Sequence, residues 1–435
     1  MHRLLTQVIC SLALFAAAFA ANAVVPTPAP PQSEPIALVG AIIHVGDGTV
    51  IGDGVITFDE GVITAVGSAA DGIDTSGHLV IDVQGSHIYP GLVLPNSTLG
   101  LLEIANIRAT NDVVEEGDIN ASVRSAIAYN TDSELIPATR FNGILTAQVT
   151  PEGGLISGLS SIFMLDAWNW EDAALRLDDG QHMHWPGFKR NRRNPDTGRF
   201  ERVDNDDYQA QVELLHTLFR DAVSYTGEPL NLNLAAMQGL FDGSGKLFLH
   251  ADGAREIISG VRFARSYGVQ DIVLVGGAEA LQVKDLLLAE SIPVIYERIH
   301  ALPGMEWHDV DAPFRMPFLL QEAGLEVGIG GGDTELQRQR NLPFYAGTAA
   351  AYGFDREAAL GLVTLNNARI LGVEDGVGSL ETGMDATLFI SVGDALDMRT
   401  SQVLGAYIQG RDIDLFGTQQ ELYERFREKY SNRVE

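Results

Sequence analysis

Hydrophobic and polar residues alternate in short runs near both ends of the chain. Between residues 36 and 90, β-branched runs such as IALVGAIIHV and GVITFDEGVITAVG are separated by turns rich in Gly and Asp, which is typical of a meander of short strands. The same pattern returns between residues 375 and 416, in DATLFISV and QVLGAYIQGRDI. We therefore expect both ends of the chain to build one composite β-sandwich.

The central part of the chain, residues 91–374, has a different period. Apolar runs such as KLFLHAD, DIVLVGG and IPVIY are followed by amphipathic stretches such as AREIISGVRFARSYG. Strands that alternate with helices predict a parallel sheet with helical crossovers, and the length suits an α/β fold of the (β/α)8 TIM-like barrel type. The charged segment 417–435 predicts a closing surface helix.

One stretch, residues 177–207, interrupts this rhythm. It reads LDDGQHMHWPGFKRNRRNPDTGRFERVDNDD, with mixed charge and little periodicity. Such a segment predicts a long excursion over the barrel mouth, either an ordered lid or a disordered insertion.

The N-terminal residues indicate export. An apolar run follows Arg3 and ends at Ala21-Asn22-Ala23, a small-x-small pattern, which predicts a secretory signal peptide over residues 1–23 and a location in the bacterial periplasm. Residues 24–35 are rich in proline and predict an extended linker. The single cysteine, Cys10, lies in the leader, so the mature chain has no disulfides and no thiolate ligands.

The charge balance limits the partners. The chain has 58 acidic and 29 basic residues and a formal net charge of −29, so its surface repels nucleic acid and anionic lipid. After the leader no apolar run is long enough to span a bilayer, which predicts no membrane insertion after cleavage. A small-molecule ligand and a homo- or hetero-oligomer remain compatible with this composition.

Two motifs resemble a known family. TLNNARILG at 364–372, with the following VGSLETGMDA at 377–386, and IYPGLV at 88–93 resemble the imidazolonepropionase-like branch of the amidohydrolase superfamily, over nearly the whole mature chain. The resemblance implies hydrolysis of C–N bonds other than peptide bonds, in small or cyclic amides. It also implies a divalent metal that activates a water molecule for this reaction.

The resemblance also assigns positions for the metal ligands. Asn96 and Thr98 stand where the family has a His-x-His pair after the first barrel strand, and Gly276 stands at the histidine position of the sixth strand. His250 and Asp333 match the histidine of the fifth strand and the aspartate of the eighth. We therefore predict His250 and Asp333 as a remnant metal set, with Asp333 also the candidate catalytic residue. Asn96, Thr98 and Gly276 are predicted to line the cavity, with an open space at Gly276.

Two ligands fall short of the roughly three protein ligands of a catalytic zinc site, so we expect no metal or a weakly bound divalent ion, zinc if any. The pair His182 and His184 is assigned a structural or solvent role because it lies in the excursion, and His300 and His308 are read as surface histidines. Two hypotheses remain: a hydrolase of small amides with a depleted metal site, or a catalytically inactive barrel that acts as a ligand-binding or partner subunit.

Overall fold

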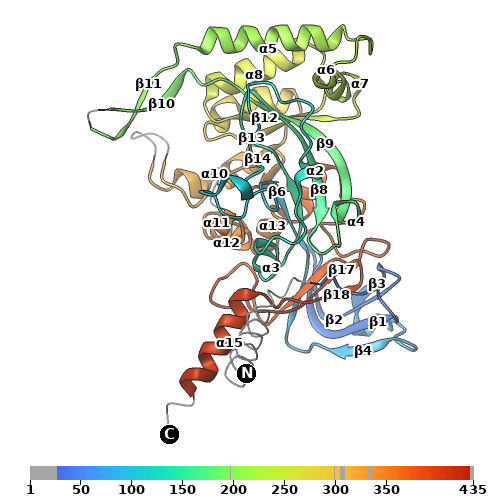
Figure 1. Ribbon diagram of the computed structural model, residues 1–435. Helices are drawn as coiled ribbons and strands as arrows, with labels where there is room; N and C mark the ends of the chain where they lie inside the picture. The colour runs from blue at the N-terminus through green and yellow to red at the C-terminus, as the bar shows by residue number, and fades with distance from the viewer. Residues whose placement is uncertain (1–26, 196, 298, 304–308, 332–335, 432–435) are drawn as a thin grey trace, which may run out of the picture.

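The computed structural model describes residues 27–195, 197–297, 299–303, 309–331 and 336–431 (Figure 1). These residues form a barrel of strands surrounded by helices and a second sheet, which lies below the barrel in Figure 1. The predicted signal peptide and Asp333 fall outside the described residues.

Both ends of the chain build the second sheet. Strand β5 pairs antiparallel with β16, so that Pro90 lies opposite Leu388 and residues from the two ends become neighbours. Leu38, Phe58 and Leu388 are fully buried in its core. That this sheet forms a sandwich of two layers stays a prediction. Its strands are β1 (Ile36–His44), β2 (Val50–Asp59), β3 (Val62–Ser68), β4 (Leu79–Asp82), β5 (His87–Pro90), β16 (Leu388–Ser391), β17 (Val403–Ile408) and β18 (Arg411–Ile413).

The barrel sheet has eight strands in the order β15-β14-β13-β12-β9-β8-β7-β6. It is nearly closed, because the backbone N–H of Gly331 donates to the carbonyl of Pro95 between its two edges, at 3.3 Å. The strands are β6 (Leu92–Ser97), β7 (Ile144–Val149), β8 (Ile156–Met164), β9 (Ala174–His184), β12 (Lys246–Ala251), β13 (Ile272–Gly276), β14 (Val294–Tyr296) and β15 (Val327–Ile329).

One barrel strand departs from the predicted (β/α)8 pattern. Strand β8 runs antiparallel to both β7 and β9, whereas the other paired barrel strands are parallel. The connection from β7 to β8 is residues 150–155, which is too short for the dozen or more residues of a parallel crossover. The barrel is therefore TIM-like, with a hairpin in place of one crossover helix.

The predicted excursion at 177–207 is wrong in its first part. Residues 177–184 belong to β9, which pairs with β12 and places His184 opposite His250. The polar Asp179 and His182 hid this strand; both are buried and bond the side chains of other barrel strands. After it, β10 (Lys189–Arg193) and β11 (Phe200–Asp204) form a hairpin that projects from the body at the left of Figure 1.

An apolar layer fills the lower part of the barrel. One buried cluster takes residues from strands all around the sheet, so these side chains must meet inside it, and helix α14 (Leu365–Leu371) closes this layer from below. Its members include Val93, Ile162, Phe248, Val273, Ile295, Ala368 and Leu371. The barrel is thus a packed core rather than a pore.

Helices cover the outside of the barrel and end in a C-terminal helix. Among them, α8 turns Ile257, Val261 and Ala264 towards the core, as its apolar spacing predicts. The helices are α2 (Ser125–Ala128), α3 (Leu135–Arg140), α4 (Trp170–Ala173), α5 (Tyr208–Val223), α6 (Leu232–Ala236), α7 (Gly239–Asp242), α8 (Ala254–Ser266), α9 (Lys284–Ala289), α10 (Ala312–Glu322), α11 (Leu336–Gln339), α12 (Leu342–Ala351), α13 (Arg356–Gly361), α14 and α15 (Thr418–Ser431). Within the described ranges, no helix has both the length and the hydropathy needed to cross a membrane.

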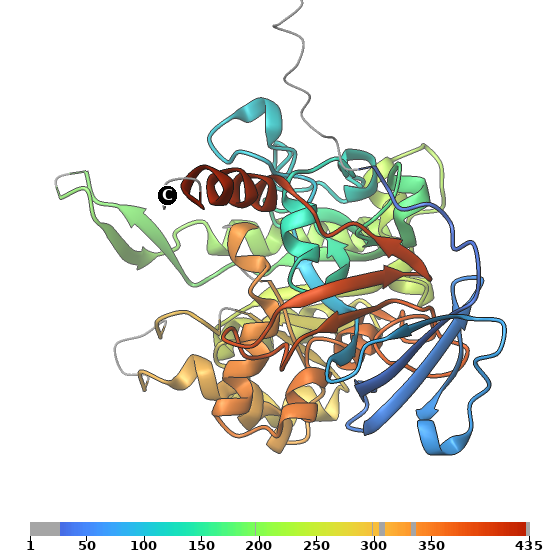
Figure 2. The same ribbon diagram turned by 90° about the horizontal axis from the view of Figure 1, so that it is seen from below.

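The described part of the Pro-rich linker, residues 27–35, is extended but held against the body. The N–H of Ala29 donates to Asp166 at 3.0 Å, and the side chain of Gln32 bonds the backbone of Phe58 and Gly61. Seen from below, this segment and α15 lie on the side of the composite sheet (Figure 2). The linker therefore adds contacts that its composition alone does not predict.

Candidate functional site

The sequence-predicted residues lie at the C-terminal ends of parallel barrel strands. His250 is near the end of β12, Gly276 ends β13, and Asn96 lies in β6 with Thr98 just after it. In a barrel of this type that end carries the functional groups. His250, Gly276 and Asn96 are each partly exposed, whereas Thr98 is buried.

Asn96 is bonded to its neighbours in the position where the family has a histidine. Its side-chain amide donates to Oε1 of Glu297, just after β14, at 2.6 Å, and its backbone N–H donates to Oε1 of Gln148 at 3.0 Å. The φ angle of Asn96 is +49°, in the left-handed region that Asn and His tolerate better than most residues. A local irregularity in the pairing of β6 with β7 turns this residue towards Glu297 and Gln148.

Gln148 continues the chain of bonds to a buried carboxyl group. Its Nε2 donates to Oδ2 of Asp179 at 2.7 Å, and the hydroxyl of Ser160 donates to Oδ1 of the same carboxyl at 2.7 Å. Burial raises the pKa of Asp179 to about 6, while the bonds from Ser160 and Gln148 act in the opposite direction. The carboxyl group is thus poised between its neutral and charged forms near pH 6.

Three histidines complete the site. Nε2 of His182 lies 2.9 Å from the hydroxyl of Ser160, and Nδ1 of His182 lies 2.8 Å from Nε2 of His250. The Ser160 hydroxyl donates its hydrogen bond to Asp179, so it accepts from His182, whose Nε2 is the donor. The Nδ1 of His182 then accepts from Nε2 of His250. The ring of His184 stacks on His250 at 4.1 Å.

All three imidazoles are held in the neutral form. Burial lowers the pKa of His182 and of His250 well below the ordinary value, and the neighbouring histidines lower them further. Burial also lowers the pKa of His184 to about 4. His182 is fully buried, whereas His184 and His250 are partly exposed, so two neutral imidazoles face the mouth.

We call these bonded residues the interior network. It runs from β14 through β6, β7, β8 and β9 to β12, and consists of Glu297, Asn96, Gln148, Asp179, Ser160, His182 and His250. Each side chain of the network is hydrogen-bonded to at least one other member. Such a connected polar layer rigidifies a core and is costly to break at any member.

The described residues do not fit the metal of the resembled family. Within them, no group of three or more His, Cys, Asp or Glu side chains is arranged to hold an ion. The rings of His184 and His250 are stacked on each other, and a ring nitrogen of His182 is bonded to one of His250. Amide and hydroxyl groups at positions 96 and 98 are poor transition-metal ligands.

Gly276 does not leave the open space that we expected. Its φ is +96°, and a Cβ atom added there would lie 2.9 Å from Oδ1 of Asp252. The carboxyl group of Asp252, which also accepts from the N–H of Ala278, fills the volume that a side chain would need. The backbone conformation therefore favours glycine here, and an added Cβ would also have to displace the exposed side chain of Asp252.

This contact gives a stability prediction. Replacing Gly276 with Ala is expected to lower the free energy of unfolding by about 1–3 kcal/mol, measured by denaturant titration. Gly268→Ala is the matched control, because Gly268 has φ +87° and no atom within 4 Å of an added Cβ, so it reports the backbone strain alone. Equal losses in the two variants would show that Asp252 offers no resistance.

Thr98, the first residue after β6, carries a buried hydroxyl group. The buried hydroxyl of Thr98 finds no hydrogen-bond partner among the described residues. A hollow of about 330 Å³ opens near the ends of β13 and β14, lined by apolar side chains together with Glu279, Gln282, Asp309 and Arg315. Its size falls in the range of small-molecule pockets.

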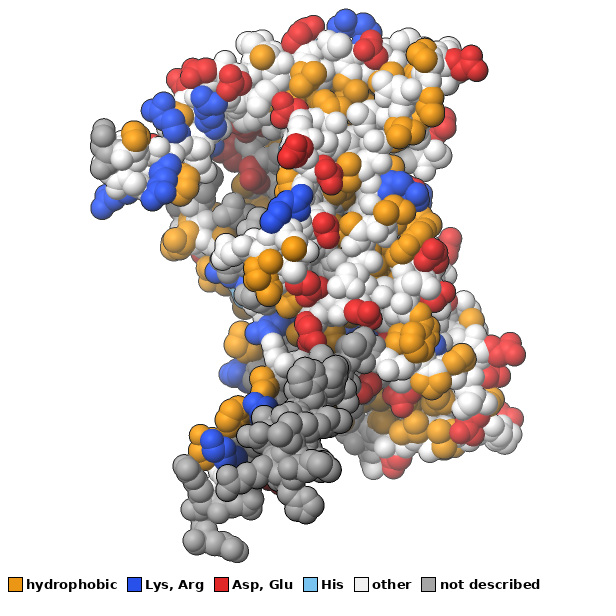
Figure 3. Space-filling model, in the orientation of Figure 1, with side chains coloured by type: hydrophobic (Ala, Val, Ile, Leu, Met, Phe, Trp, Pro, Cys, Tyr) orange, Lys and Arg blue, Asp and Glu red, His pale blue; other side chains and the backbone are white. Residues whose placement is uncertain are grey.

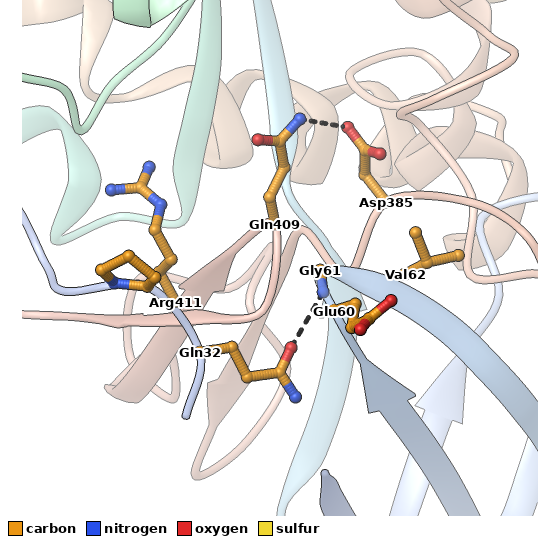
Figure 4. A pocket seen from close by; sticks show the side chains of 8 residues that line it. Gln32, Glu60, Gly61, Val62, Asp385, Gln409 and Arg411 are labelled. Atoms are coloured by element: carbon orange, nitrogen blue, oxygen red, sulfur yellow. Dashed lines mark hydrogen bonds between the residues drawn. The ribbon is translucent and has the colours of Figure 1, made fainter. Parts of the chain in front are cut away.

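A larger hollow, of about 380 Å³, belongs to a different place (Figure 4). It lies between the linker and the composite sheet, where Gln32 accepts from the N–H of Gly61 at 2.9 Å and Gln409 donates to Asp385 at 3.0 Å. These bonds fasten the linker and the sheet edge. None of the barrel-strand ends contributes to its lining, so it is separate from the interior network.

Sequence reasoning missed several members of the site. His182 and His184 were assigned to a loop. A His-x-His pair is also typical of a β-strand, because alternate residues of a strand point to the same side. Gln148 is one of several polar residues that the sequence places near the mouth, whereas Ser160 and Glu297 carried no signal of their own. His300 is exposed, in agreement with its reading as a surface histidine, and bonds Thr348 at 2.7 Å, whereas His308 is outside the described residues.

Comparisons with known proteins bear on the fold. No family model and no curated protein matches the sequence. An amidohydrolase from Thermotoga maritima superposes with a TM-score of 0.75 and 20% identity, over 87% of this chain and 99% of that one. A prolidase complexed with N-methylphosphonate-L-proline gives 0.55 and 16%, over 87% and 99%. A zinc-bound adenosine deaminase from Xanthomonas campestris gives 0.51 and 16%, over 93% and 100%.

These likenesses cover nearly the whole of each compared chain, at an identity that speaks for the fold alone. The chain has the fold of the amidohydrolase superfamily, a TIM-like barrel with an additional sheet, and the resemblance seen in the sequence is confirmed at that level. Its place in the imidazolonepropionase-like branch stays a prediction.

Proposed function

We propose that this chain is an amidohydrolase-fold protein that binds a small amide or cyclic amide at the barrel mouth without metal-dependent hydrolysis. The observation that carries the proposal is the bond from the Asn96 amide to Glu297, at 2.6 Å. At the position where the family has an imidazole for the ion, this chain has a neutral amide that is engaged by a carboxylate. The rest of the interior network continues that arrangement across the barrel.

The mouth offers the groups that an amide ligand needs. Glu297 and Asn96 are partly exposed and can accept from a ligand N–H, and the partly exposed His250 and His184 offer neutral ring nitrogens. A few polar groups converging on a rigid barrel rim are how small-molecule sites are built.

A second candidate is hydrolysis of a C–N bond in the same ligands. The observation in its favour is the gathering of His182, His184 and His250 at the ends of two adjacent strands, since imidazoles serve both as bases and as metal ligands. The two candidates share the ligand class and differ in turnover.

Metal analysis of the purified chain separates them. We expect no stoichiometric zinc by mass spectrometry and no hydrolysis of N-acyl amino acids, dipeptides or cyclic amides when zinc, manganese or cobalt is added. About one tightly bound zinc per chain, or turnover that follows the added metal, would return the chain to the active hydrolases.

Ligand binding is tested on the same compounds. A bound amide is expected to raise the melting temperature, and above its Kd the rise should follow the logarithm of its concentration; Glu297→Gln should weaken that shift. Glu322→Gln, an exposed carboxyl on α10 that is remote from the network, is the matched control. If no compound in the panel stabilises the parent chain, the ligand class is wrong.

A further inference from the structure

The hairpin of β10 and β11 is a basic arm on an acidic protein. Residues 189–204 contain six Lys or Arg and three Asp or Glu, whereas the chain as a whole has a net charge of −29. The hairpin projects from the body in Figure 1, and Figure 3 shows Lys and Arg side chains gathered on that projection. Positive charge is thus concentrated where it can reach another molecule.

The arm lacks the support that a two-stranded hairpin usually needs. β10 and β11 form a sheet of two strands only, and every residue of β10 is exposed. The Phe200 side chain is 74% exposed. A lone hairpin is at best marginally stable in water, so packing against a further surface would stabilise both its strands and this aromatic ring.

The base of the arm is neutralised, but its outer part is not. Lys189 pairs with Asp204, and Arg190 pairs with Asp206 and Asp207, close to the body. Further out, Arg192 and Arg199 have no ion pair among the described residues. These cations and Phe200 together form a surface that is both positive and apolar.

The same chain carries a surface of the opposite kind. The segment 104–118 follows β6 and exposes four carboxyl groups, of Asp112, Glu115, Glu116 and Asp118, against one basic residue. It also exposes large apolar side chains, with Ile104 53%, Ile107 46% and Val114 48% accessible. Negative charge and apolar area thus occur together, as an acceptor for the arm requires.

We propose that the β10–β11 arm of one copy docks on the 104–118 segment of a second copy, and that the exchange is reciprocal, giving a two-fold dimer. The charge complementarity of the two surfaces selects a second copy of this chain as the occupant. Because a two-fold interface uses both surfaces twice, each copy both gives an arm and receives one. Both elements follow barrel strands, β9 and β6, at the end that carries the mouth, so the partner's arm would lie at the rim of the candidate site.

Salt dependence is the first expected result. Sedimentation velocity of the mature chain should show a dimer at micromolar concentration in low salt that dissociates as sodium chloride is raised to about 0.5 M, where the screening length is a few ångströms. A chain that stays monomeric in low salt, or a dimer that does not respond to salt, contradicts the proposal. The same holds for a monomer that binds anionic vesicles or nucleic acid.

Charge reversal tests the two surfaces. The double variant Arg192→Glu and Arg199→Glu should weaken dimerisation by at least about tenfold, because like charges then oppose each other across the interface. The matched control, Arg220→Glu with Arg262→Glu, makes the same change in net charge on exposed positions of α5 and α8 and should leave the dimer as in the parent.

A charge swap decides which surface receives the arm. The variant Glu115→Arg with Glu116→Arg should also be monomeric. Mixing it with the arm variant should restore a dimer, because one interface then joins a reversed arm to a reversed acceptor and the other joins the two parental surfaces. If mixing restores nothing while each variant is folded by circular dichroism, the acceptor is not residues 104–118 and the proposal fails.

Discussion

Restoring histidine at positions 96 and 98 is expected to raise the zinc affinity of this chain by about 100-fold or more, because two imidazoles would join the one at His250. The backbone permits the change. Asn96 has φ +49°, a conformation that histidine also tolerates, and the hydroxyl of Thr98 has no partner among the described residues that its removal would strand. Glu297, which loses the Asn96 amide, can accept from the new ring and orient it.

The measurement is metal content after dialysis, followed by competition with a chromogenic chelator. Asn96→Ala with Thr98→Ala is the matched control, because it removes the same side chains and adds no ligand. If the histidine variant binds no more zinc than the alanine variant, the ends of β6 and β12 do not bring positions 96 and 250 within reach of one ion. The depleted-site interpretation would then need a different geometry.

The alternation of strands and helices in the sequence predicted the barrel. The apolar residues that pack together recur at regular spacing along each element, and this spacing is visible in the sequence. The run KLFLHAD became β12 and DIVLVGG became β13, with Leu247, Leu249 and Leu274 buried towards the helices. The return of short strands at both ends predicted their shared sheet. These features follow from local pattern, which a single sequence contains.

The site was less accessible to such reasoning. β9 was missed because Asp179, His182 and His184 make it polar. Buried polar side chains are stable only when they bond partners on other strands, which here are Ser160 and Gln148. The reversed direction of β8 depends on the short connection before it. At Gly276 the absent side chain suggested space, but the carboxyl group of Asp252 occupies it. The misses at β9 and at Gly276 depended on neighbours that lie further away in the sequence.

The interior network explains how the barrel accommodates buried polar side chains. An amide, a hydroxyl, a carboxyl group and imidazoles each lose water on burial, and each unmade bond would cost about 1–3 kcal/mol. Here Gln148 uses both ends of its amide, on Asn96 and on Asp179, and Ser160 links Asp179 to His182. Hydrogen bonds thus connect the polar side chains of this layer, with one ionisable carboxyl group at the centre.

That carboxyl group should give the protein a distinctive dependence of stability on pH. The pKa of Asp179 is raised from an ordinary 3.8 to about 6 in the folded chain. The folded state therefore keeps its proton in a pH range where the unfolded state releases it. The resulting stabilisation is fully present below pH 3.8 and is lost as the pH rises to about 6. A difference of this size in pKa corresponds to about 3 kcal/mol.

Asp179→Asn isolates this effect because an asparagine has the hydrogen-bonding pattern of the neutral acid: its oxygen accepts from Gln148 and its NH2 donates to Ser160. The stability of the variant relative to the parent should increase by about 2 kcal/mol between pH 4 and pH 6 and become constant only above about pH 7, as measured by urea unfolding at each pH. The buried histidines titrate in both proteins, so their contribution cancels in the difference.

Asp242→Asn is the control of opposite sign, since bonds from Ser244 lower the pKa of that exposed carboxyl group. A difference between Asp179→Asn and the parent that does not change from pH 4 to pH 7 would mean that the folded state holds Asp179 no more tightly protonated than the unfolded chain does, and that the polar layer stabilises its charge fully.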